Sequence, residues 1–282
     1  MRGVRIHRIR RRLKSGLRFL AILLFGLVMA APLFYLISAS LMSRSAILTY
    51  PPRLVPPDVV WHNYVEAFNF LSPRVIGNSV IFSVGIVLIQ LLIAVPAGFA
   101  LAKIPFRRVA MVMAILVVPM FIPSNMTLIP TYLVVHQMQL VGTYAGMILP
   151  VAGQSAFAIL LFRQNFVSLP TGLIDAARID GAGWTRVLIS IALPLVRPAI
   201  AAYVSISFLT AWNIYIWPQV VAPDPAHQVM TVALAPLASG QYSLLSPSVG
   251  MAAAVISMVP VLLLFIVFQR WYVKGVVGTG VD

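Results

Sequence analysis

Between residues 109 and 162 the chain carries no Asp, Glu, Lys or Arg for fifty-four consecutive positions. A transmembrane helix needs about 20 apolar residues to cross a hydrocarbon core of ~30 Å. The run is about twice that length, so it is predicted to turn back where His, Gln and Gly cluster, at 136–143. This divides it into two predicted spans, 110–134 and 144–162. Three prolines predict a kink in the first of them: Pro119, Pro123 and Pro130.

Four shorter charge-free runs each have the length of one crossing. They predict spans at 20–41, 75–102, 199–218 and 249–268. A cleavable signal peptide is the competing interpretation of the first run, because a basic segment precedes it. Its uncharged stretch is twenty-five residues long, whereas the apolar core of a signal peptide has ~7 to 15. The sequence therefore predicts six transmembrane helices.

The composition indicates an all-α, polytopic membrane protein. Hydrophobic residues make up 61% and charged residues 9% of the 282 residues, and the mean hydropathy is +0.97. A soluble domain cannot keep so apolar a chain in water. The chain has no cysteine, which excludes disulfides, a thiolate nucleophile and a cysteine metal site. The predicted organisation is a basic tail at 1–18, a six-helix transmembrane domain at 19–273 and a second tail at 274–282.

Basic residues set the predicted orientation. The net charge is +14, and eight of the twenty Lys and Arg lie in the first eighteen residues. Their place before an apolar run indicates a cytoplasmic anchor that favours anionic lipid, and not a nucleic-acid surface. With the amino terminus inside, seventeen basic residues are cytoplasmic and three are outside. Both termini and the loop at about 164–198 are therefore predicted to face the cytoplasm.

Acidic residues are absent from the predicted spans. All six lie in loops or tails: Asp58, Glu66, Asp175, Asp180, Asp224 and Asp282. An ion-coupled carrier, the first alternative function, usually needs an embedded carboxylate or histidine. A membrane-bound enzyme is the second alternative, but the sequence has no Ser-His-acid set, no metal-ligand spacing of histidines and no phosphate-binding loop. No catalytic residue, metal site or cofactor is predicted in this chain.

The long polar island between two membrane-length apolar runs is 174–194, IDAARIDGAGWTRVLISIALP. Residues 173–179 predict a helix, which Ser168 or Thr171 would cap at its start. The Asp-Gly pair at 180–181 predicts a terminating turn, in which glycine takes a positive φ at little cost.

A second amphipathic helix is predicted after this turn. Apolar residues recur at helical spacing over 184–192, until Pro194. The residues around the turn are small, so the surface of another protein can approach the backbone closely. The island is therefore the expected docking site.

The same stretch resembles the EAA loop of ATP-binding-cassette importer permeases, whose pattern is roughly Glu-Ala-Ala, Asp-Gly-Ala and Ile-x-Leu-Pro. The matching residues here are Asp175, Ala176, Ala177, Asp180, Gly181, Ala182, Ile191, Leu193 and Pro194. Asp175 stands where the family usually has glutamate, so its charge sits on a shorter arm. An interfacial amphipathic helix is the alternative interpretation. The resemblance implies a type I importer fold, in which these residues couple transport to separate ATPase subunits.

Three further segments are similar to the carbohydrate-uptake subgroup of these permeases, the maltose-type and glycerol-phosphate-type subunits. They are PTYLVVHQMQLVGTYAGMILP (130–150), AWNIYIWP (211–218) and FQRWYVKG (268–275). The resemblance covers about 63–275 and implies that the solute is a sugar, a polyol or glycerol 3-phosphate. The end of the chain, 275–282, departs from the Gly-Ala-x-Lys-Gly tail of many relatives.

The family resemblance also implies the partners and the location. The partners are a second permease of similar fold, a dimer of ATP-binding subunits that hold ATP and Mg, an extracytoplasmic solute-binding protein and the lipid bilayer. The chain would then be a multi-pass protein of a prokaryotic inner (plasma) membrane.

The span 199–218 supplies the aromatic planes and hydrogen-bonding groups that a path for sugars needs. Trp212 and Tyr215 are three residues apart, and Asn213 and Trp217 are four apart, so each pair would be adjacent on one helix. These four residues are the predicted solute path, with the interfacial aromatic belt as the alternative role of Trp217. The span has no cation, so a glycerol phosphate would need a basic pocket from a partner.

Overall fold

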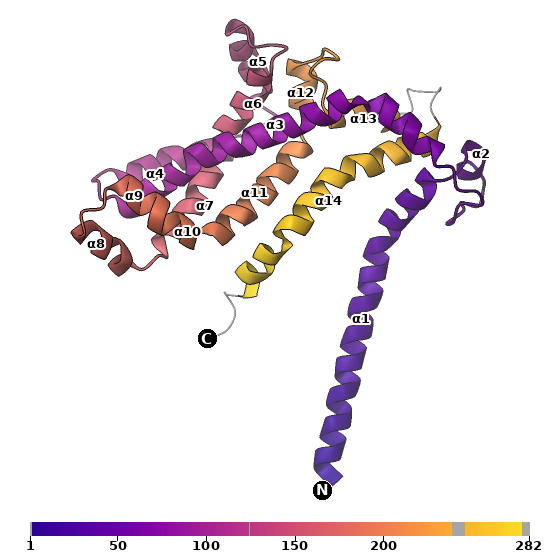
Figure 1. Ribbon diagram of the computed structural model, residues 1–282, viewed down its shortest axis with the longest axis horizontal. Helices are drawn as coiled ribbons and strands as arrows, with labels where there is room; N and C mark the ends of the chain where they lie inside the picture. Colours follow the sequence, from indigo (N-terminus) through magenta and orange to yellow (C-terminus); the bar gives the residue numbers. More distant parts are fainter. Residues whose placement is uncertain (1, 124, 239–245, 278–282) are drawn as a thin grey trace. The chain divides into compact units, whose positions relative to one another are not determined.

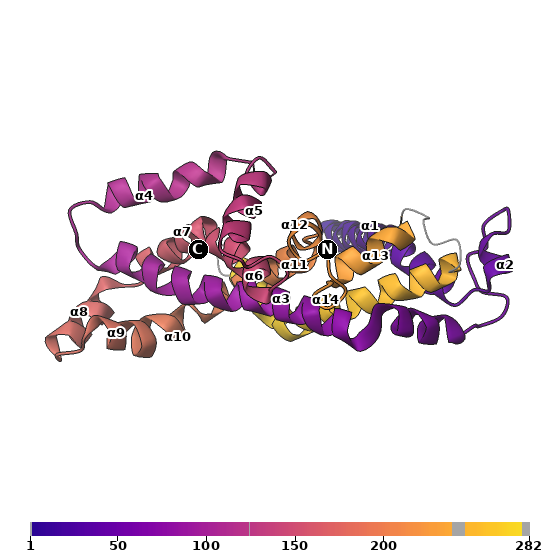
Figure 2. The same ribbon diagram turned by 90° about the horizontal axis from the view of Figure 1, so that it is seen from above.

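The computed structural model describes residues 2–123, 125–238 and 246–277, with side chains from 16 to 269 inside these ranges. Within them every regular element is a helix, which confirms the all-α expectation (Figures 1 and 2). In chain order they are α1 (Arg2–Ser40), α2 (Arg44–Ile47), α3 (His62–Lys103), α4 (Val109–Val117), the 3₁₀ helix η1 (Val118–Phe121), α5 (Leu128–Gln137), α6 (Tyr144–Gly153), α7 (Ala156–Val167), α8 (Thr171–Ile179), α9 (Trp184–Val187), the π-helix η2 (Leu188–Ala192), α10 (Leu193–Leu195), α11 (Arg197–Trp212), α12 (Ile216–Val221), α13 (Met230–Ala238) and α14 (Pro247–Val277).

Three of the described helices are long and apolar enough to cross a membrane: Gly16–Ser40 of α1, His62–Lys103 of α3 and Pro247–Gln269 of α14. They correspond to the predicted spans 20–41, 75–102 and 249–268. Two further pairs reach the necessary length only together. These are α6 with α7, bent by 49°, and Trp184–Leu195 with α11, bent by 78°.

The predicted span 110–134 is interrupted, as its prolines indicated. The first piece, α4 with η1, ends at Phe121, and the second, α5, begins at Leu128. Ile122 between them is extended, with φ −90° and ψ 117°, because the following Pro123 disfavours the helical conformation of the residue before it. The described residues therefore do not form six continuous membrane-spanning helices. The turn expected at 136–143 is confirmed, since α5 ends at Gln137 and α6 begins at Tyr144.

The predicted continuous helix over 199–218 is wrong near its end, where residues 213–215 are not helical. The helix α11 ends at Trp212, and a new short helix, α12, begins at Ile216. A continuous helix would need an N–H at residue 218, but Pro218 has none, and its ring clashes with the carbonyl four residues earlier.

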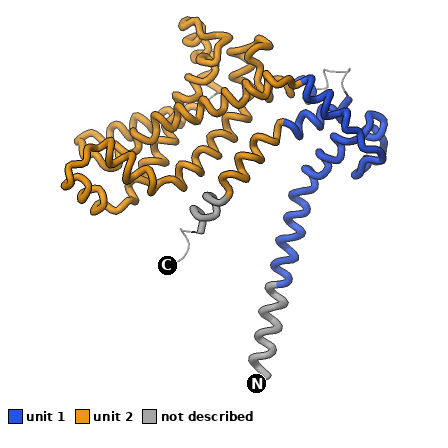
Figure 3. The backbone as a smooth tube through the Cα atoms, in the orientation of Figure 1, with its two compact units in different colours: residues 1–70, 236–256 blue, residues 71–235, 257–282 orange. Residues whose placement is uncertain are grey.

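The chain divides into two compact units, 1–70 with 236–256 and 71–235 with 257–282 (Figure 3). The helix α3 belongs to both units and is interrupted at Ser72, whose φ of 55° and ψ of 151° are not helical. Pro73 follows it and again excludes the helical conformation of the preceding residue.

In the first unit, hydrogen bonds fasten the end of α1 to the start of α3. The Asn63 amide donates to the carbonyl oxygens of Ser40 at 2.8 Å and Met42 at 2.9 Å. The hydroxyls of Ser40 and Tyr64 lie 2.7 Å apart. Because Asn63 and Ser40 are buried, these bonds satisfy backbone groups that water does not reach.

In the second unit, α7 packs between α3 and α11. A Cβ on Gly98 of α3 would lie 2.8 Å from the backbone nitrogen of Arg163 and 2.9 Å from the Cβ of Phe162, so only glycine allows this approach. The rings of Phe99 and Phe166 then meet edge to face at 5.4 Å, and those of Phe162 and Tyr203 at 5.3 Å. Close packing and aromatic contacts hold the three helices together.

Candidate functional site

The turn of the polar island is a Schellman motif at the end of α8. Gly181 has a φ of +81°, its N–H donates to the carbonyl of Arg178 at 3.1 Å, and the N–H of Ala182 donates to that of Ala177 at 2.9 Å. These are the two bonds that define the motif. The predicted helix and its glycine turn are therefore confirmed.

The predicted cap of α8 is wrong. Its N-cap is Pro170, which makes no side-chain cap bond, and Thr171 is already the first helical residue. The hydroxyl of Ser168 donates instead to the carbonyl of Asn165 at 2.7 Å.

The second helix of the island is present, but it widens into a π turn. After α9, the N–H of Leu193 bonds to the carbonyl of Leu188, five residues earlier. Pro194 has no N–H and crowds the carbonyl four residues before it, which favours such a local change of helix type. The chain then bends by 78° before α11.

Buried apolar residues anchor the island in the second unit. Ile174, Val187 and Ala192 are buried in the same cluster as Phe99. The guanidinium of Arg178 lies 4.5 Å from the ring centroid of Trp184 and donates to the carbonyl of Ala182 at 2.8 Å. No sequence pattern predicted this contact, because Arg178 lies on α8 and Trp184 on α9, and the turn between them breaks the helical spacing.

The predicted coupling residues differ in exposure. Four of them are exposed: Asp175, Ala176, Asp180 and Gly181. The other five are partly buried: Ala177, Ala182, Ile191, Leu193 and Pro194. Ile179, which the pattern did not single out, is 86% exposed. Neither Asp175 nor Asp180 forms an ion pair with another described residue. The turn therefore presents an apolar side chain and two carboxylates that have no ionic partner in this part of the chain.

The structure separates the four residues predicted to line the solute path. Trp212 is buried, stacks on Phe208 at 5.5 Å and donates its indole N–H to the carbonyl of Ser257 at 3.2 Å. Trp217 is buried on α12 and donates to the carbonyl of Met147 at 2.9 Å. The two indoles thus have packing partners within the second unit.

Asn213 and Tyr215 lie between these helices and are exposed. The Asn213 amide donates to the carbonyl of Leu209 at 2.8 Å. Because α11 ends before Asn213 and Trp217 lies on α12, the expected adjacency of this pair on one helix is wrong.

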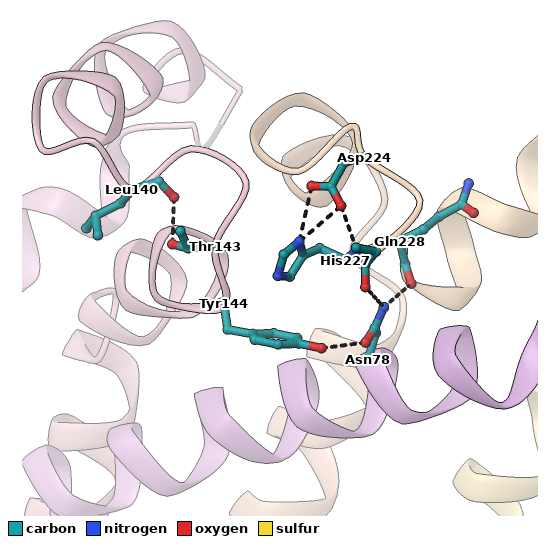
Figure 4. A network of polar contacts seen from close by, with 8 residues as sticks. Asn78, Leu140, Thr143, Tyr144, Asp224, His227 and Gln228 are labelled. Atoms are coloured by element: carbon teal, nitrogen blue, oxygen red, sulfur yellow. Dashed lines mark hydrogen bonds and ion pairs between the residues drawn. The ribbon is translucent and has the colours of Figure 1, made fainter.

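A polar network joins α3, α6 and the segment between α12 and α13 (Figure 4). The Asn78 amide donates to the carbonyls of Ala226 and Gln228, both at 2.9 Å, and its oxygen accepts from the Tyr144 hydroxyl at 2.6 Å. The ring of His227 meets that of Tyr144 at 4.8 Å. Asn78 thereby fixes a loop that is about 150 residues away in the chain, which no local pattern predicts.

His227 also contacts Asp224, with Nδ1 at 3.1 Å from both carboxylate oxygens. Partial burial by itself raises the pKa of Asp224. The hydrogen bond and charge of His227 and the backbone N–H groups of His227 and Ala226 outweigh it, so the pKa lies below its ordinary value. The carboxylate is therefore held in its charged form.

Comparisons with known proteins identify the family. A family model described as "Binding-protein-dependent transport system inner membrane component" matches residues 94–278. The sn-glycerol-3-phosphate transport system permease protein UgpE of Brucella abortus is 32% identical over 267 residues, which cover 92% of this chain and 94% of UgpE. The arabinooligosaccharides transport system permease protein AraQ of Halalkalibacterium halodurans is 32% identical over 247 residues, 86% of each chain.

Solved structures of ABC importers have a similar fold. A chain from a bacterial ABC transporter involved in the import of the acidic polysaccharide alginate superposes with a TM-score of 0.80 at 25% identity, covering 93% of this chain and 97% of that one. A chain of the MetNI methionine ABC transporter shares the fold, with a TM-score of 0.54 at 18% identity over 73% of this chain and 96% of that one. The chain therefore belongs to the binding-protein-dependent transport system inner membrane components and is a permease subunit of an ABC importer.

Proposed function

We propose that this permease and a second one of similar fold form the route by which a sugar, a polyol or glycerol 3-phosphate enters a prokaryotic cell from an extracytoplasmic solute-binding protein. Relatives are named for glycerol 3-phosphate and arabinooligosaccharide transport, and a solved relative for alginate import. These solutes share a hydroxyl-rich chain or ring, which supports this chemical class.

We propose that separate ATP-binding subunits dock on this chain at the turn of Gly181. It presents the exposed Ile179 together with the exposed carboxylates of Asp175 and Asp180. Ile174 and Val187 on either side of the turn are buried in the core of the second unit and hold it in place. A protruding apolar residue flanked by charges suits a cleft in a partner protein. The partners would bind ATP and Mg and hydrolyse the nucleotide, while this chain transmits the movement and performs no catalysis.

The solute route includes the segment after α11. Asn213 and Tyr215 are exposed and offer an amide and a phenol to a hydroxyl-rich solute, while Trp212 and Trp217 hold the segment in place by packing on either side. Asn213→Leu should impair uptake and spare the basal ATPase activity of the assembled complex. Normal uptake by this variant would assign the segment to packing alone.

The arrangement in the cell follows from the charge distribution. We place the protein in the inner (plasma) membrane as a multi-pass subunit, with both termini and the Gly181 turn in the cytoplasm, because basic residues accumulate on that side.

Reconstitution tests the proposal. The chain should be co-purified with its partner permease and ATPase subunits and placed in proteoliposomes with the solute-binding protein. ATP hydrolysis should rise when the binding protein carries its solute, and uptake should persist when ionophores collapse all ion gradients. Uptake that a proton or sodium gradient drives without ATP would contradict it.

A further inference from the structure

A small cavity in the second unit opens beside the break between α6 and α7. Its volume is about 150 Å³, and its lining comes from α3, from α6, α7 and the break between them, and from α11 with the residues that follow it. Polar side chains supply the smaller part of that lining: Gln90, Gln154, Tyr203, Ser207 and Thr210. No Asp, Glu, Lys, Arg or His is among its lining residues. The cavity is therefore uncharged, with a few polar side chains on a mostly apolar wall.

The floor of the cavity is a buried hydrogen-bond cluster around Gln90. Its side-chain oxygen accepts from the Tyr203 hydroxyl at 2.7 Å and the Ser207 hydroxyl at 2.6 Å. Its amide donates to the carbonyl of Val151 at 3.5 Å. An amide has two N–H groups, so one of them has no acceptor among the residues that the structure describes. The floor retains a donor that a hydroxyl oxygen can satisfy.

The rim is exposed and combines polar with apolar groups. Gln154 offers an amide. The Thr210 hydroxyl donates to the carbonyl of Ile206 at 2.8 Å and offers its oxygen as an acceptor. Phe157 and Ile206 are about half exposed. Gln154 lies outside both flanking helices, with a φ of −76° and a ψ of 53°. Irregular backbone inside a membrane protein is tolerated where it is buried in protein or lines a water-filled space. This face therefore belongs to an aqueous route or to a partner surface, and not to lipid.

We propose that this cavity is a subsite on the solute route, which takes one uncharged, hydroxyl-rich unit of the transported solute. The proposal rests on the proposed import of such solutes. Hydroxyls pair with Gln90, Gln154 and Thr210, and the ring of Phe157 covers an apolar face of the sugar. Ligand pockets commonly measure ~300–1,000 Å³, so a cavity of about 150 Å³ holds only part of a solute. A phosphate group finds no cation here and must bind elsewhere.

Single cysteines test whether water and solute reach the cavity. The sequence has no native cysteine, so Gln154→Cys and Thr210→Cys can be labelled in the assembled complex with a charged thiol reagent. Both should react, and arabinotriose delivered by the binding protein should slow the reaction. Leu92→Cys, at a position that is 74% exposed on the apolar α3, is the control and should react slowly. Lack of labelling at both cavity positions would overturn the proposal.

Uptake by rim variants tests the solute contact. Thr210→Val and Gln154→Leu remove exposed hydrogen-bonding groups and leave the buried Gln90 cluster intact. Each should raise the half-saturating concentration of arabinotriose about threefold to tenfold, the loss expected for one neutral hydrogen bond. Thr210→Ser keeps the hydroxyl and should behave like the wild type. Co-purification of the partner subunits with each variant verifies assembly.

The outcomes separate the two proposals. If the wild-type complex takes up arabinotriose and the double variant Gln154→Leu/Thr210→Val does so equally well, the cavity is not a subsite, although the proposed function stands. If the wild-type complex takes up neither arabinotriose nor sn-glycerol 3-phosphate, the proposed solute class is wrong, and the subsite falls with it.

Discussion

Gly181 is the residue on which the turn at the end of α8 depends. Its φ of +81° lies in the left-handed region, and a Cβ there would have no atom within 4 Å. The restriction is therefore in the backbone and not in the space around it. A residue with a side chain costs about 1–2 kcal/mol in this conformation.

Gly181→Leu should leave membrane insertion and assembly intact but weaken the coupling of transport to ATP hydrolysis, by a free energy of about 1–3 kcal/mol. The measurement is uptake per ATP hydrolysed in proteoliposomes. Gly172→Leu is the matched control, since it adds the same side chain within α8, where nothing lies within 4 Å and the φ is ordinary. Wild-type coupling in an assembled Gly181→Leu complex would remove the turn from the mechanism.

Asp180 tests the charge beside this turn. Its carboxylate has no ion-pair partner in the described part of the chain, so its removal should affect contacts with other subunits more than the fold. Asp180→Ala should lower solute-stimulated ATPase activity, and the difference from the wild type should shrink at high salt, because salt screens exposed charges. A fall in the thermal stability of the isolated subunit would instead indicate a structural role.

The helices α3 and α7 approach each other closely at Gly98, in the core of the second unit. Gly98→Leu should destabilise the subunit by about 1–3 kcal/mol, because backbone atoms of α7 occupy the place of the new Cβ and the core is already filled. Thermal unfolding in detergent measures this. Gly77→Leu, also on α3, has nothing within 4 Å of its Cβ position and should unfold at the wild-type temperature. Equal stability of the two variants would mean that the helices separate freely.

The segment between α12 and α13 is stabilised by the charged carboxylate of Asp224, and this stabilisation depends on pH. The pKa of Asp224 is below its ordinary value of 3.8, so its stabilisation of the segment is complete above that value and is lost as the pH falls through the lower, folded-state pKa. The protection of amides 224–230 against hydrogen exchange, measured relative to the intrinsic rate at the same pH, should therefore fall on acidification below the ordinary value of 3.8. Asp224→Asn should show the faster exchange at neutral pH. Exchange in the variant that matches the wild type at neutral pH would contradict this.

The topology of the whole molecule can be tested in the same cysteine-free background. Thr171→Cys and Thr279→Cys should be labelled only from the cytoplasmic side, and Gln241→Cys only from outside, because seventeen of twenty basic residues lie on the cytoplasmic side of the predicted topology. Thr279 and Gln241 lie outside the described residues. Labelling of Thr171→Cys from outside would reverse the orientation.

Physical constraints that act locally made much of this protein predictable from its sequence. Lipid offers no hydrogen bonds to the backbone, so long uncharged runs form helices, and the runs around 20–41, 75–102 and 249–268 do so. The turn at Gly181 was predictable because glycine takes positive φ at little cost. The interruption after Phe121 followed from the prolines nearby, whose geometry breaks a helix in any environment.

Contacts between distant residues were decided by the tertiary structure alone. Periodicity does not reveal that Gln90 on α3 meets Tyr203 and Ser207, more than a hundred residues later. Nor does it reveal that Trp212 and Trp217 have different hydrogen-bond partners. A buried polar group must find a partner, but which partner depends on how the helices pack. The sequence therefore determined the long helices and the turn at Gly181, and the packing of α3, α7 and α11 decided which polar side chains line a cavity.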